Sequence, residues 1–285
     1  MSNEPVIVEA SAPLDLRLSE PELEETRAHI TAFIEEMVDD AGAEGTVLGL
    51  SGGIDSTLTA HLAVDALGAD HVHGLVMPSE VNTTDNMSDA ERVARDLGIE
   101  YDVIDIGPIY DAFVEAFPGE STATEVESDP LRTAAGNVRV RIRAVLDYFV
   151  ANAENRVVLG TGNRSETLTG YFTKYGDGAV DCHPIGNLYK QQVRQLADHL
   201  GVDEDLVTKT PSAEMWTGQT DETEMGLGYD TLDAILALHV DGPLSTSATI
   251  RHLDVTAEQV ERVVELYERS AHKRRMPPAP DPLHL

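Results

Sequence analysis

The stretch SGGIDS, which begins at Ser51, combines residue types suited to holding the phosphates of a ligand. Gly52 and Gly53 allow the backbone to approach phosphate oxygens closely, and the amides that follow would point at an anion from a helix N-terminus. Ser51 and Ser56 can add hydroxyl donors. Asp55 would repel a phosphate unless a cation lay between them, so we interpret it as a Mg²⁺ ligand, a hard oxygen for a hard cation.

The same loop lacks a residue that the phosphate-binding loops of kinase-like ATPases and GTPases carry. Their pattern G-x-x-x-x-G-K-[ST] places a lysine against the terminal phosphates, and SGGIDS contains none. This composition favours holding pyrophosphate as a leaving group over transfer of the terminal phosphoryl group. The alternative, a purely structural Gly-Gly turn, is less favoured because an apolar strand precedes the loop and a helix follows it.

Charge marks further candidate positions. The chain has 51 acidic and 20 basic residues, a formal net charge of −31. A charge of this sign repels nucleic acid, so we expect no nucleic-acid partner. The four lysines are Lys174, Lys190, Lys209 and Lys273. An acidic composition nearly without lysine indicates adaptation to high salt, and it makes each remaining lysine a stronger candidate for a function.

Two basic segments interrupt this acidic chain. LRTAAGNVRVRIR, residues 131–143, carries four arginines and no acidic residue, and HKRR follows near the C-terminus from His272 onward. Both favour an anionic small molecule as the ligand. The alternatives are pairing of the arginines with acidic residues one helical turn away, and a favourable helix C-terminus for HKRR.

A βα alternation must position these residues. Apolar patterns predict strands at 46–50, 72–77, 101–106 and 156–161, and helices at 22–41, 56–67, 84–97, about 130–152 and from 163 onward. Short apolar strands between helices predict an α/β fold, a doubly wound parallel sheet with helices on both faces, with additional C-terminal helices. Ligands of such sheets bind at the carboxyl ends of the strands, so SGGIDS and GTGNRSE should face one crevice.

The remaining features bound the domain organisation. We expect one domain over residues 19–276, an acidic mobile tail over 1–18 and a Pro-rich tail over 277–285. The sequence has no run of about 18 apolar residues and begins without a secretory signal, so we expect no membrane partner and a cytoplasmic location. The single cysteine, Cys182, excludes an internal disulfide and a four-cysteine zinc site.

Longer motifs carry a family resemblance. SGGIDS resembles the S-G-G-x-D-S signature of the ATP pyrophosphatase superfamily, whose members cleave ATP to AMP and pyrophosphate while adenylating a substrate. GTGNRSETLTGYFTKYGDGAVD, residues 160–181, resembles the central motif of NAD synthetases, and KTPSAEMWTGQTDETEMGLGYDTLD, residues 209–233, resembles the next block of that family. NVRVRIRA and the C-terminal HKR also fit, so the resemblance covers roughly residues 22–276.

The resemblance implies a Rossmann-like adenine-nucleotide hydrolase fold and a set of site residues. The implied ATP-binding residues are Gly49, Leu50, Ser51, Gly52, Gly53, Ile54, Asp55, Ser56, Thr161, Lys190 and Ser212. Those implied for deamido-NAD are Arg141, Lys174, Asp181, His272 and Lys273. Asp55 and Glu166 would hold Mg²⁺, although Glu166 near a helix start could simply complement the helix dipole. Asp177 is a candidate for the ammonia site.

The implied reaction is the ATP-dependent amidation of deamido-NAD to NAD through an adenylated intermediate, which releases AMP and pyrophosphate. Free ammonia is the expected nitrogen source, since glutamine-using relatives carry an amidase domain with a catalytic cysteine. The family also implies a homodimer. TKYGDGAVD, residues 173–181, suits a lid that excludes water from the intermediate, the alternative being a plain flexible loop.

Two other functions stay open at this point. The chain could be another ATP pyrophosphatase that amidates or thiolates a different substrate. It could also be a nucleotide-binding module that has lost its chemistry, although the retention of both Asp55 and Glu166 argues against that. AMP release measured with and without deamido-NAD would separate the three.

Overall fold

Four short strands form a parallel sheet in the computed structural model, which describes residues 16–79, 84–117, 129–212, 216 and 219–281. The strands are β1 (Gly45–Gly49), β2 (Val72–Val76), β3 (Glu100–Val103) and β4 (Arg156–Val158), and their spatial order is β3-β2-β1-β4. Thr46 of β1 pairs with Val72 on one side and Val157 on the other. The predicted parallel sheet is confirmed.

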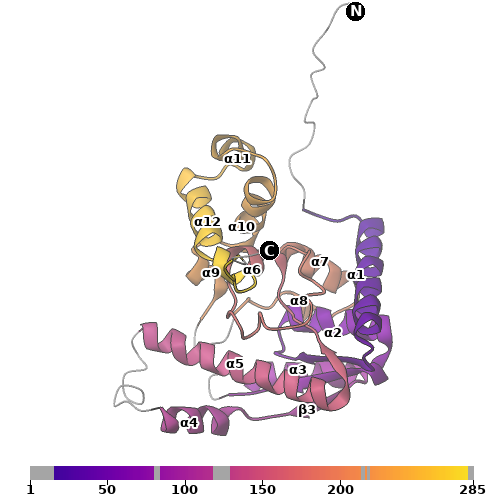
Figure 1. Cartoon of the computed structure of the whole chain (residues 1–285). Coiled ribbons are helices and arrows are strands. Elements are labelled where there is room, and N and C mark those ends of the chain that lie inside the picture. The colour runs from indigo at the N-terminus through magenta and orange to yellow at the C-terminus, as the bar shows by residue number, and fades with distance from the viewer. Residues whose placement is uncertain (1–15, 80–83, 118–128, 213–215, 217–218, 282–285) are drawn as a thin grey trace, which may run out of the picture.

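Helices cover both faces of this sheet (Figure 1). One face packs against α1 (Glu20–Ala41), α2 (Ile54–Leu67), α3 (Thr84–Leu97), α7 (Lys190–His199) and α8 (Glu204–Val207) in the main apolar core. The other face packs against α5 (Asp129–Glu154), beside which lies α4 (Gly107–Ala116). A single 3-10 turn, η1 (Ala69–His71), leads into β2. The doubly wound α/β prediction is confirmed.

The predicted C-terminal helices form a second core beside the carboxyl edge of the sheet. Its elements are α6 (Arg164–Thr169), α9 (Asp221–Met225), α10 (Tyr229–Ile235), a π-helical turn η2 (Leu236–Val240), α11 (Thr246–Leu253), α12 (Ala257–Arg269) and η3 (Ala271–Lys273). Tyr229, Leu232 and Val263 are buried there. The C-terminal segment therefore packs against α6 and α7 rather than forming a free appendage.

Two strands end three residues earlier than their apolar patterns predict. The pattern over 101–106 gives a strand only to Val103, and Asp105 accepts a hydrogen bond from the Gly107 amide, 2.8 Å, in the turn that leads into α4. The pattern over 156–161 gives a strand only to Val158. Beyond it, the Gly160 amide donates to the Cys182 carbonyl, 2.8 Å, so the chain pairs there with the segment that follows TKYGDGAVD, residues 173–181.

The order of the strands fixes where a ligand can enter. The connections from β1 through α2 and α3 lie on one face, whereas α4 and α5 return the chain to β4 on the other. β1 and β4 are neighbours, so a crevice opens between their carboxyl ends, the usual ligand site in such sheets. SGGIDS follows β1 and GTGNRSE follows β4, and both motifs therefore face this crevice as predicted.

Candidate active site

Hydrogen bonds from its own serine hydroxyls fix the conformation of the loop after β1. The Ser51 amide donates to Ser56 Oγ, 3.2 Å, and the two serine hydroxyls lie 3.0 Å apart. Gly52 has a φ of +74°, a backbone region that favours glycine, and Gly53 is the N-cap of α2. The first amides of α2 thus face the crevice at the positive end of a helix of 14 residues, which suits an anion.

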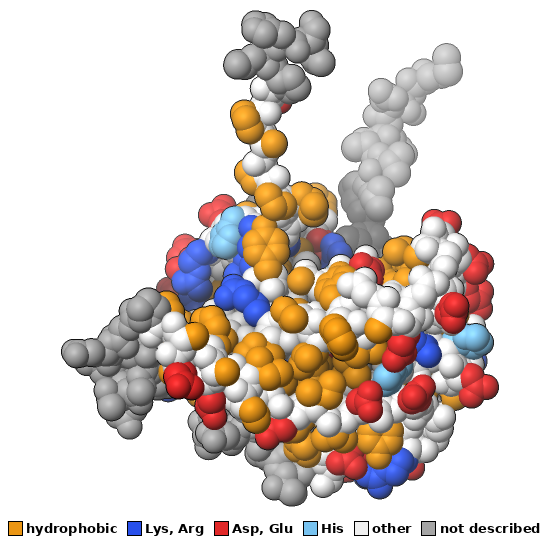
Figure 2. All heavy atoms as spheres, turned by 60° about the horizontal axis from the view of Figure 1, so that its bottom comes forward, with side chains coloured by type: hydrophobic (Ala, Val, Ile, Leu, Met, Phe, Trp, Pro, Cys, Tyr) orange, Lys and Arg blue, Asp and Glu red, His pale blue; other side chains and the backbone are white. Residues whose placement is uncertain are grey.

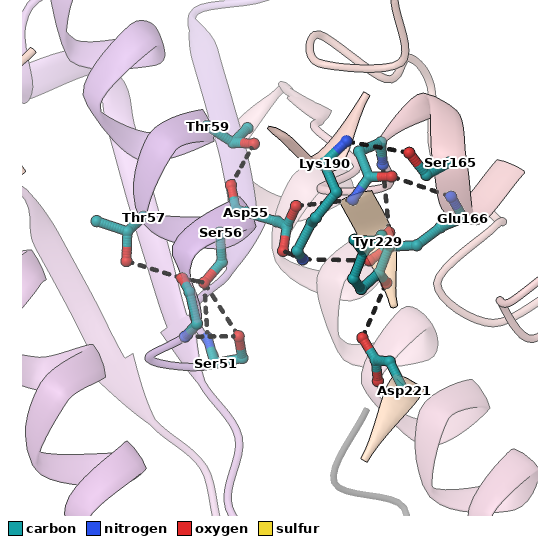
Figure 3. Close-up of polar contacts among 12 residues, drawn as sticks. Ser51, Asp55, Ser56, Thr57, Thr59, Ser165, Glu166, Lys190, Asp221 and Tyr229 are labelled. Carbon is teal, nitrogen blue, oxygen red and sulfur yellow. Dashed lines mark hydrogen bonds and ion pairs between the residues drawn. The ribbon is translucent and has the colours of Figure 1, made fainter. Parts of the chain in front are cut away.

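A cluster of opposite charges lies beside this loop (Figure 3). Lys190 forms a short ion pair with Asp55, and its Nζ lies 3.6 Å from Glu166 Oε1. Asn163 donates from Nδ2 to Asp55 Oδ1, 2.9 Å, and caps α6 by accepting the Glu166 amide, 3.0 Å. One asparagine therefore fixes both carboxylates relative to each other.

The position of Lys190 follows from its place at the start of α7. Its backbone amide donates to Ser165 Oγ, 3.0 Å, so the beginning of α7 is tied to α6. Its side chain is 3 % exposed and its ammonium lies 5.4 Å from the centroid of the Tyr229 ring. Tyr229 in turn donates to Asp221, 2.9 Å. The ammonium is thus enclosed by an aromatic face and carboxylates from three segments.

The charges in this cluster shift one another's titration. Burial lowers the pKa of the Lys190 ammonium, but the neighbouring Asp55 and Glu166 outweigh that effect and raise it, so the lysine stays charged. Burial, and then the charge of Asp55, raise the pKa of the Glu166 carboxyl. Burial also raises the pKa of Asp221. One ammonium is therefore shared by more carboxylates than it can neutralise.

This excess of buried carboxylate fits a divalent cation. Asp55 and Glu166 both lie within ion-pair distance of Lys190, and their carboxylate oxygens are hard ligands suited to Mg²⁺. Both lie next to the loop that is suited to binding phosphate. Mg²⁺ in nucleotide sites usually takes one or two carboxylates and completes its shell with phosphate oxygens and water. Within the described residues no group of three or more His, Cys, Asp or Glu side chains could hold a metal by itself. The two carboxylates match the share that the protein would provide.

A cavity of about 1010 Å³ opens over the loop and the charged cluster. All eleven residues predicted for ATP line it, from Gly49 to Ser56 together with Thr161, Lys190 and Ser212. Glu166, Asp177 and Lys273 line it as well. The described structure thus brings together segments that are more than 150 residues apart in the chain.

Three of the residues predicted for deamido-NAD form a chain of contacts outside the lining of this cavity. Arg141 donates from Nη2 to the Lys174 carbonyl, 3.1 Å, and Lys174 donates from Nζ to the His272 carbonyl, 2.7 Å. Lys273, which lines the cavity, donates to the carbonyls of Gly170 and Phe172, 2.7 and 2.6 Å.

Asp181 lies elsewhere. Its carboxylate accepts the Tyr148 hydroxyl, 3.0 Å, and the Val158 amide, 2.8 Å, at the end of β4. In this structure Asp181 therefore supports the sheet edge, separate from the Arg141–Lys174–His272 contacts.

Arg274 of HKRR binds at helix C-termini, which was the alternative role predicted for that segment. Its guanidinium donates to the Leu168 carbonyl at the end of α6, 2.8 Å, and to the Ser270 hydroxyl, 2.6 Å, after α12. Cations stabilise helix C-termini because the last carbonyls there lack intrahelical partners. Lys273 and Arg274 therefore fasten the end of the chain onto the wall of the cavity.

Asp177 lines the cavity within a tightly folded turn. Its Oδ1 accepts the Thr173 amide at 2.6 Å, and burial raises the pKa of the carboxyl to about 6. Gly176 lies against Thr173 and Val140, with no room for a Cβ, and Gly178 lies against Phe172. The glycines therefore serve close packing, and residues 173–178 have their own internal contacts.

Several residues in or beside the cavity received no specific role from the sequence. Asn163 holds both metal-type carboxylates, and Lys209 bonds the phosphate loop; Lys209 had a signal, as one of only four lysines. Trp216 stacks under the guanidinium of Arg132, 4.6 Å from its carbon to the ring centroid. Asp147 carries a buried Oδ1 with no hydrogen-bond partner among the described residues, and burial raises its pKa to about 7.

The chain is similar to known proteins over most of its length. A family model described as NAD synthase matches residues 26–277. A protein of Halobacterium salinarum named NH(3)-dependent NAD(+) synthetase is 61% identical over 269 residues, which cover 94% of this chain and 97% of that protein.

Two solved structures are similar over nearly the whole chain. An NMN synthetase from Francisella tularensis has a TM-score of 0.77 and 35% identity, covering 93% of this chain and 100% of its own. An NH3-dependent NAD synthetase from Campylobacter jejuni has a TM-score of 0.73 and 31% identity, covering 91% and 99%. On the family match and these relatives, the chain belongs to the NAD synthase family.

Proposed function

We propose that this chain amidates deamido-NAD to NAD with ATP and ammonia, through an adenylated intermediate, and releases AMP and pyrophosphate. One observation carries the proposal. The phosphate loop after β1 and the paired carboxylates Asp55 and Glu166 line the same cavity as Lys273 of the basic C-terminal segment. Such a cavity can hold a nucleoside triphosphate and a second anionic substrate together.

The first step forms a bond between the nicotinate carboxylate oxygen and the α-phosphorus of ATP and breaks the bond to pyrophosphate. The loop amides and the Ser51 and Ser56 hydroxyls hold the phosphates, and Lys190 places a positive charge beside them. Asp55 and Glu166 would hold Mg²⁺, which when bound neutralises charge on the leaving group. The side chains supply position and charge, and no covalent intermediate with the protein is needed.

The second step is attack of ammonia on the acyl carbon, which expels AMP. Ammonium must lose a proton before it can attack, and Asp177 in the cavity wall is the proposed acceptor. Burial raises the pKa of Asp177 to about 6, closer to neutrality than an ordinary aspartate, which favours proton exchange.

The mononucleotide is the alternative substrate, since one similar structure is that of an NMN synthetase. The volume of about 1010 Å³ and the basic residue Lys273 in the cavity lining favour the dinucleotide. Binding energy from contacts to the additional nucleotide would be lost with the shorter substrate.

A product assay tests the function. Protein in molar KCl with ATP, Mg²⁺, deamido-NAD and an ammonium salt should form NAD, AMP and pyrophosphate in equal amounts. Nicotinate mononucleotide should react poorly, and glutamine in place of ammonium should give little NAD. ADP as the nucleotide product would refute the reaction, and a preference for the mononucleotide would replace only the substrate.

We also propose a homodimer, in the cytoplasm where ATP and the dinucleotide are available. Within the described residues no helix is long and apolar enough to cross a membrane. Hydrophobic side chains gather on the face formed by α4 and α5 (Figure 2). The exposed members on these helices are Ile109, Phe113, Val145 and Phe149, of which Phe149 is 70% exposed. Contiguous apolar surface on an acidic protein marks an interface, and a second copy offers the same apolar face.

The oligomeric state tests this assignment. Replacing Phe149 and Val145 by serine should convert the dimer to a monomer in light-scattering measurements in molar KCl. Met276→Ser is the control, since Met276 is 86% exposed but follows η3 in the chain and belongs to neither α4 nor α5. A double variant that remains dimeric would contradict the proposed interface.

A further inference from the structure

The lysine that SGGIDS lacks is supplied from a distant part of the chain. Lys209 donates from Nζ to the Gly52 carbonyl at 3.0 Å, although 157 positions separate them. The same ammonium donates to Asp89 Oδ2 at 2.6 Å, and Lys209 lines the cavity. An ammonium has three N–H donors, so these two contacts with described residues leave the third donor for a ligand.

We propose that Lys209 is the cation of the phosphate loop and binds the β- and γ-phosphates of ATP and then the departing pyrophosphate. The inference rests on the ATP-dependent reaction proposed above and adds a binding residue to it. The ligand class is a pyrophosphate group, because the ammonium lies at the loop and not beside the basic C-terminal segment.

The electrostatics of the loop explain why a cation is needed there. The Gly52 carbonyl is the negative end of a peptide dipole at an anion site, and an uncompensated carbonyl would oppose phosphate. The ammonium of Lys209 covers that oxygen and fixes the peptide whose φ of +74° shapes the turn. The phosphates would then face the ammonium of Lys209 instead of the bare Gly52 carbonyl oxygen.

Asp89 on α3 holds the ammonium in place. Lys209 is 28% exposed and Asp89 is 20% exposed, so the pair lies partly out of water. Asp89 is itself 3.2 Å from Arg92, and Arg92 also contacts Asp205 at 2.7 Å. The lysine is therefore held between two segments while it remains partly exposed to solvent.

Two lysines from outside the loop, Lys190 and Lys209, lie at different places in the site. Lys190 is paired with Asp55 and Glu166, whereas Lys209 contacts the Gly52 carbonyl of the loop itself. Lys209 precedes Ser212, a predicted ATP contact that also lines the cavity and whose hydroxyl donates to the Gln219 carbonyl, 2.7 Å. The two residues thus reach the cavity on one short segment.

Kinetics and inhibition test the role. Lys209→Met should raise the KM for ATP and the inhibition constant of pyrophosphate by about tenfold each, and leave the KM for deamido-NAD within about twofold. Lys209→Arg should recover most of the pyrophosphate affinity. Arg95→Met is the matched control, since Arg95 pairs with Glu91 on the outer surface of α3 and is 59% exposed. A folded Lys209→Met protein with unchanged pyrophosphate inhibition would overturn the proposal, because a merely structural tether would not set that constant.

A second measurement needs no variant and no turnover. The chain has only four lysines, so the rate of amine acetylation at each can be followed by mass spectrometry of the native protein. Mg²⁺ with pyrophosphate should slow acetylation of Lys209 by more than about threefold and leave Lys174, outside the cavity lining, unchanged. Equal rates at Lys209 with and without saturating pyrophosphate would refute the contact. Protection without NAD synthesis would support the contact and refute only the reaction.

Discussion

At the scale of single residues, the site depends on how Asn163 arranges two carboxylates around one ammonium. Asp55 accepts a hydrogen bond from the Asn163 side-chain amide, and Glu166 forms a capping box with Asn163 at the start of α6. Neither bond is visible from residue types alone, since 108 positions separate Asp55 from Asn163. The charge pattern of the site therefore rests on an uncharged side chain.

Asp55→Asn tests the carboxylate that the metal assignment needs. Asparagine keeps an acceptor for Asn163 but removes the charge, so the fold should survive. Turnover should fall more than about tenfold, because the charge on the leaving group loses its stabilisation. The measurement is kcat with circular dichroism of the same sample. Asp65→Asn, on the same helix but paired with Arg27 at the surface, should retain activity, and near-normal turnover of folded Asp55→Asn would contradict the assignment.

Asp147 gives a pH-dependent stability. Burial raises its pKa to about 7, partly offset by the charge of Arg143, whereas the unfolded value is about 4. The folded chain thus holds an extra proton between these values, so this residue makes the protein less stable as pH rises from about 4 to about 7. Asp147→Asn should raise the Tm by a few degrees at pH 8 and change it little at pH 5. An equal effect at both values in the ligand-free protein would show that ionisation is not the cause.

At the scale of elements, the C-terminal turn η3 matters more than its length suggests. Its end, Lys273, and the following Arg274 bind carbonyls of α6 and of the segment after it. Carbonyls at the end of α6 would otherwise lack partners within the helix. The segment at η3 therefore supplies partners to a helix end, with 106 positions between Arg274 and Leu168.

Lys273→Met separates this turn from the phosphate loop. Loss of the bonds to Gly170 and Phe172 should loosen the wall of the cavity and raise the KM for deamido-NAD by about tenfold, while the KM for ATP stays within about twofold. Arg275→Met should have little effect, because the neighbouring Arg275 is exposed. Equal increases in both KM values would instead indicate a general loss of structure.

The elements were more predictable than their contacts. The alternation of strand and helix patterns predicts all four strands and the long α5. The signal is strongest for β1, β2 and β4, because buried parallel strands need continuous apolar stretches, whereas β3 is mostly exposed. Strand ends were predicted less well, as at Val103 and Val158, because a single turn residue or a change of neighbour decides them. SGGIDS predicts its own loop, whereas Lys209 reaches that loop only through the tertiary fold.

At the scale of the whole molecule, the net charge of −31 sets the conditions under which the fold is stable. Like charges on a compact chain repel, and added salt screens them within about 3 Å at 1 M but only within about 10 Å at 0.1 M. Ion pairs such as Arg27–Asp65 and Arg92–Asp205 offset little of this charge, because 51 acidic residues face only 20 lysines and arginines.

Lowering KCl from molar concentration to about 0.1 M should therefore reduce the Tm and the turnover together. Thermal melting and NAD formation over a KCl series measure the two. Potassium replaced by sodium at equal ionic strength is the control for a specific ion effect. Melting and turnover independent of salt would exclude adaptation to high salt and leave the enzyme assignment intact.

The stacking of Arg132 on Trp216 has an optical consequence. Trp216 is the single tryptophan of the chain, and its ring lines the cavity beside a guanidinium. All indole emission thus originates at the wall of the ligand site, and its wavelength and intensity depend on the water and charges next to it. The protein carries a built-in fluorophore, so the order in which ATP and the dinucleotide enter can be followed by stopped-flow fluorescence without a label.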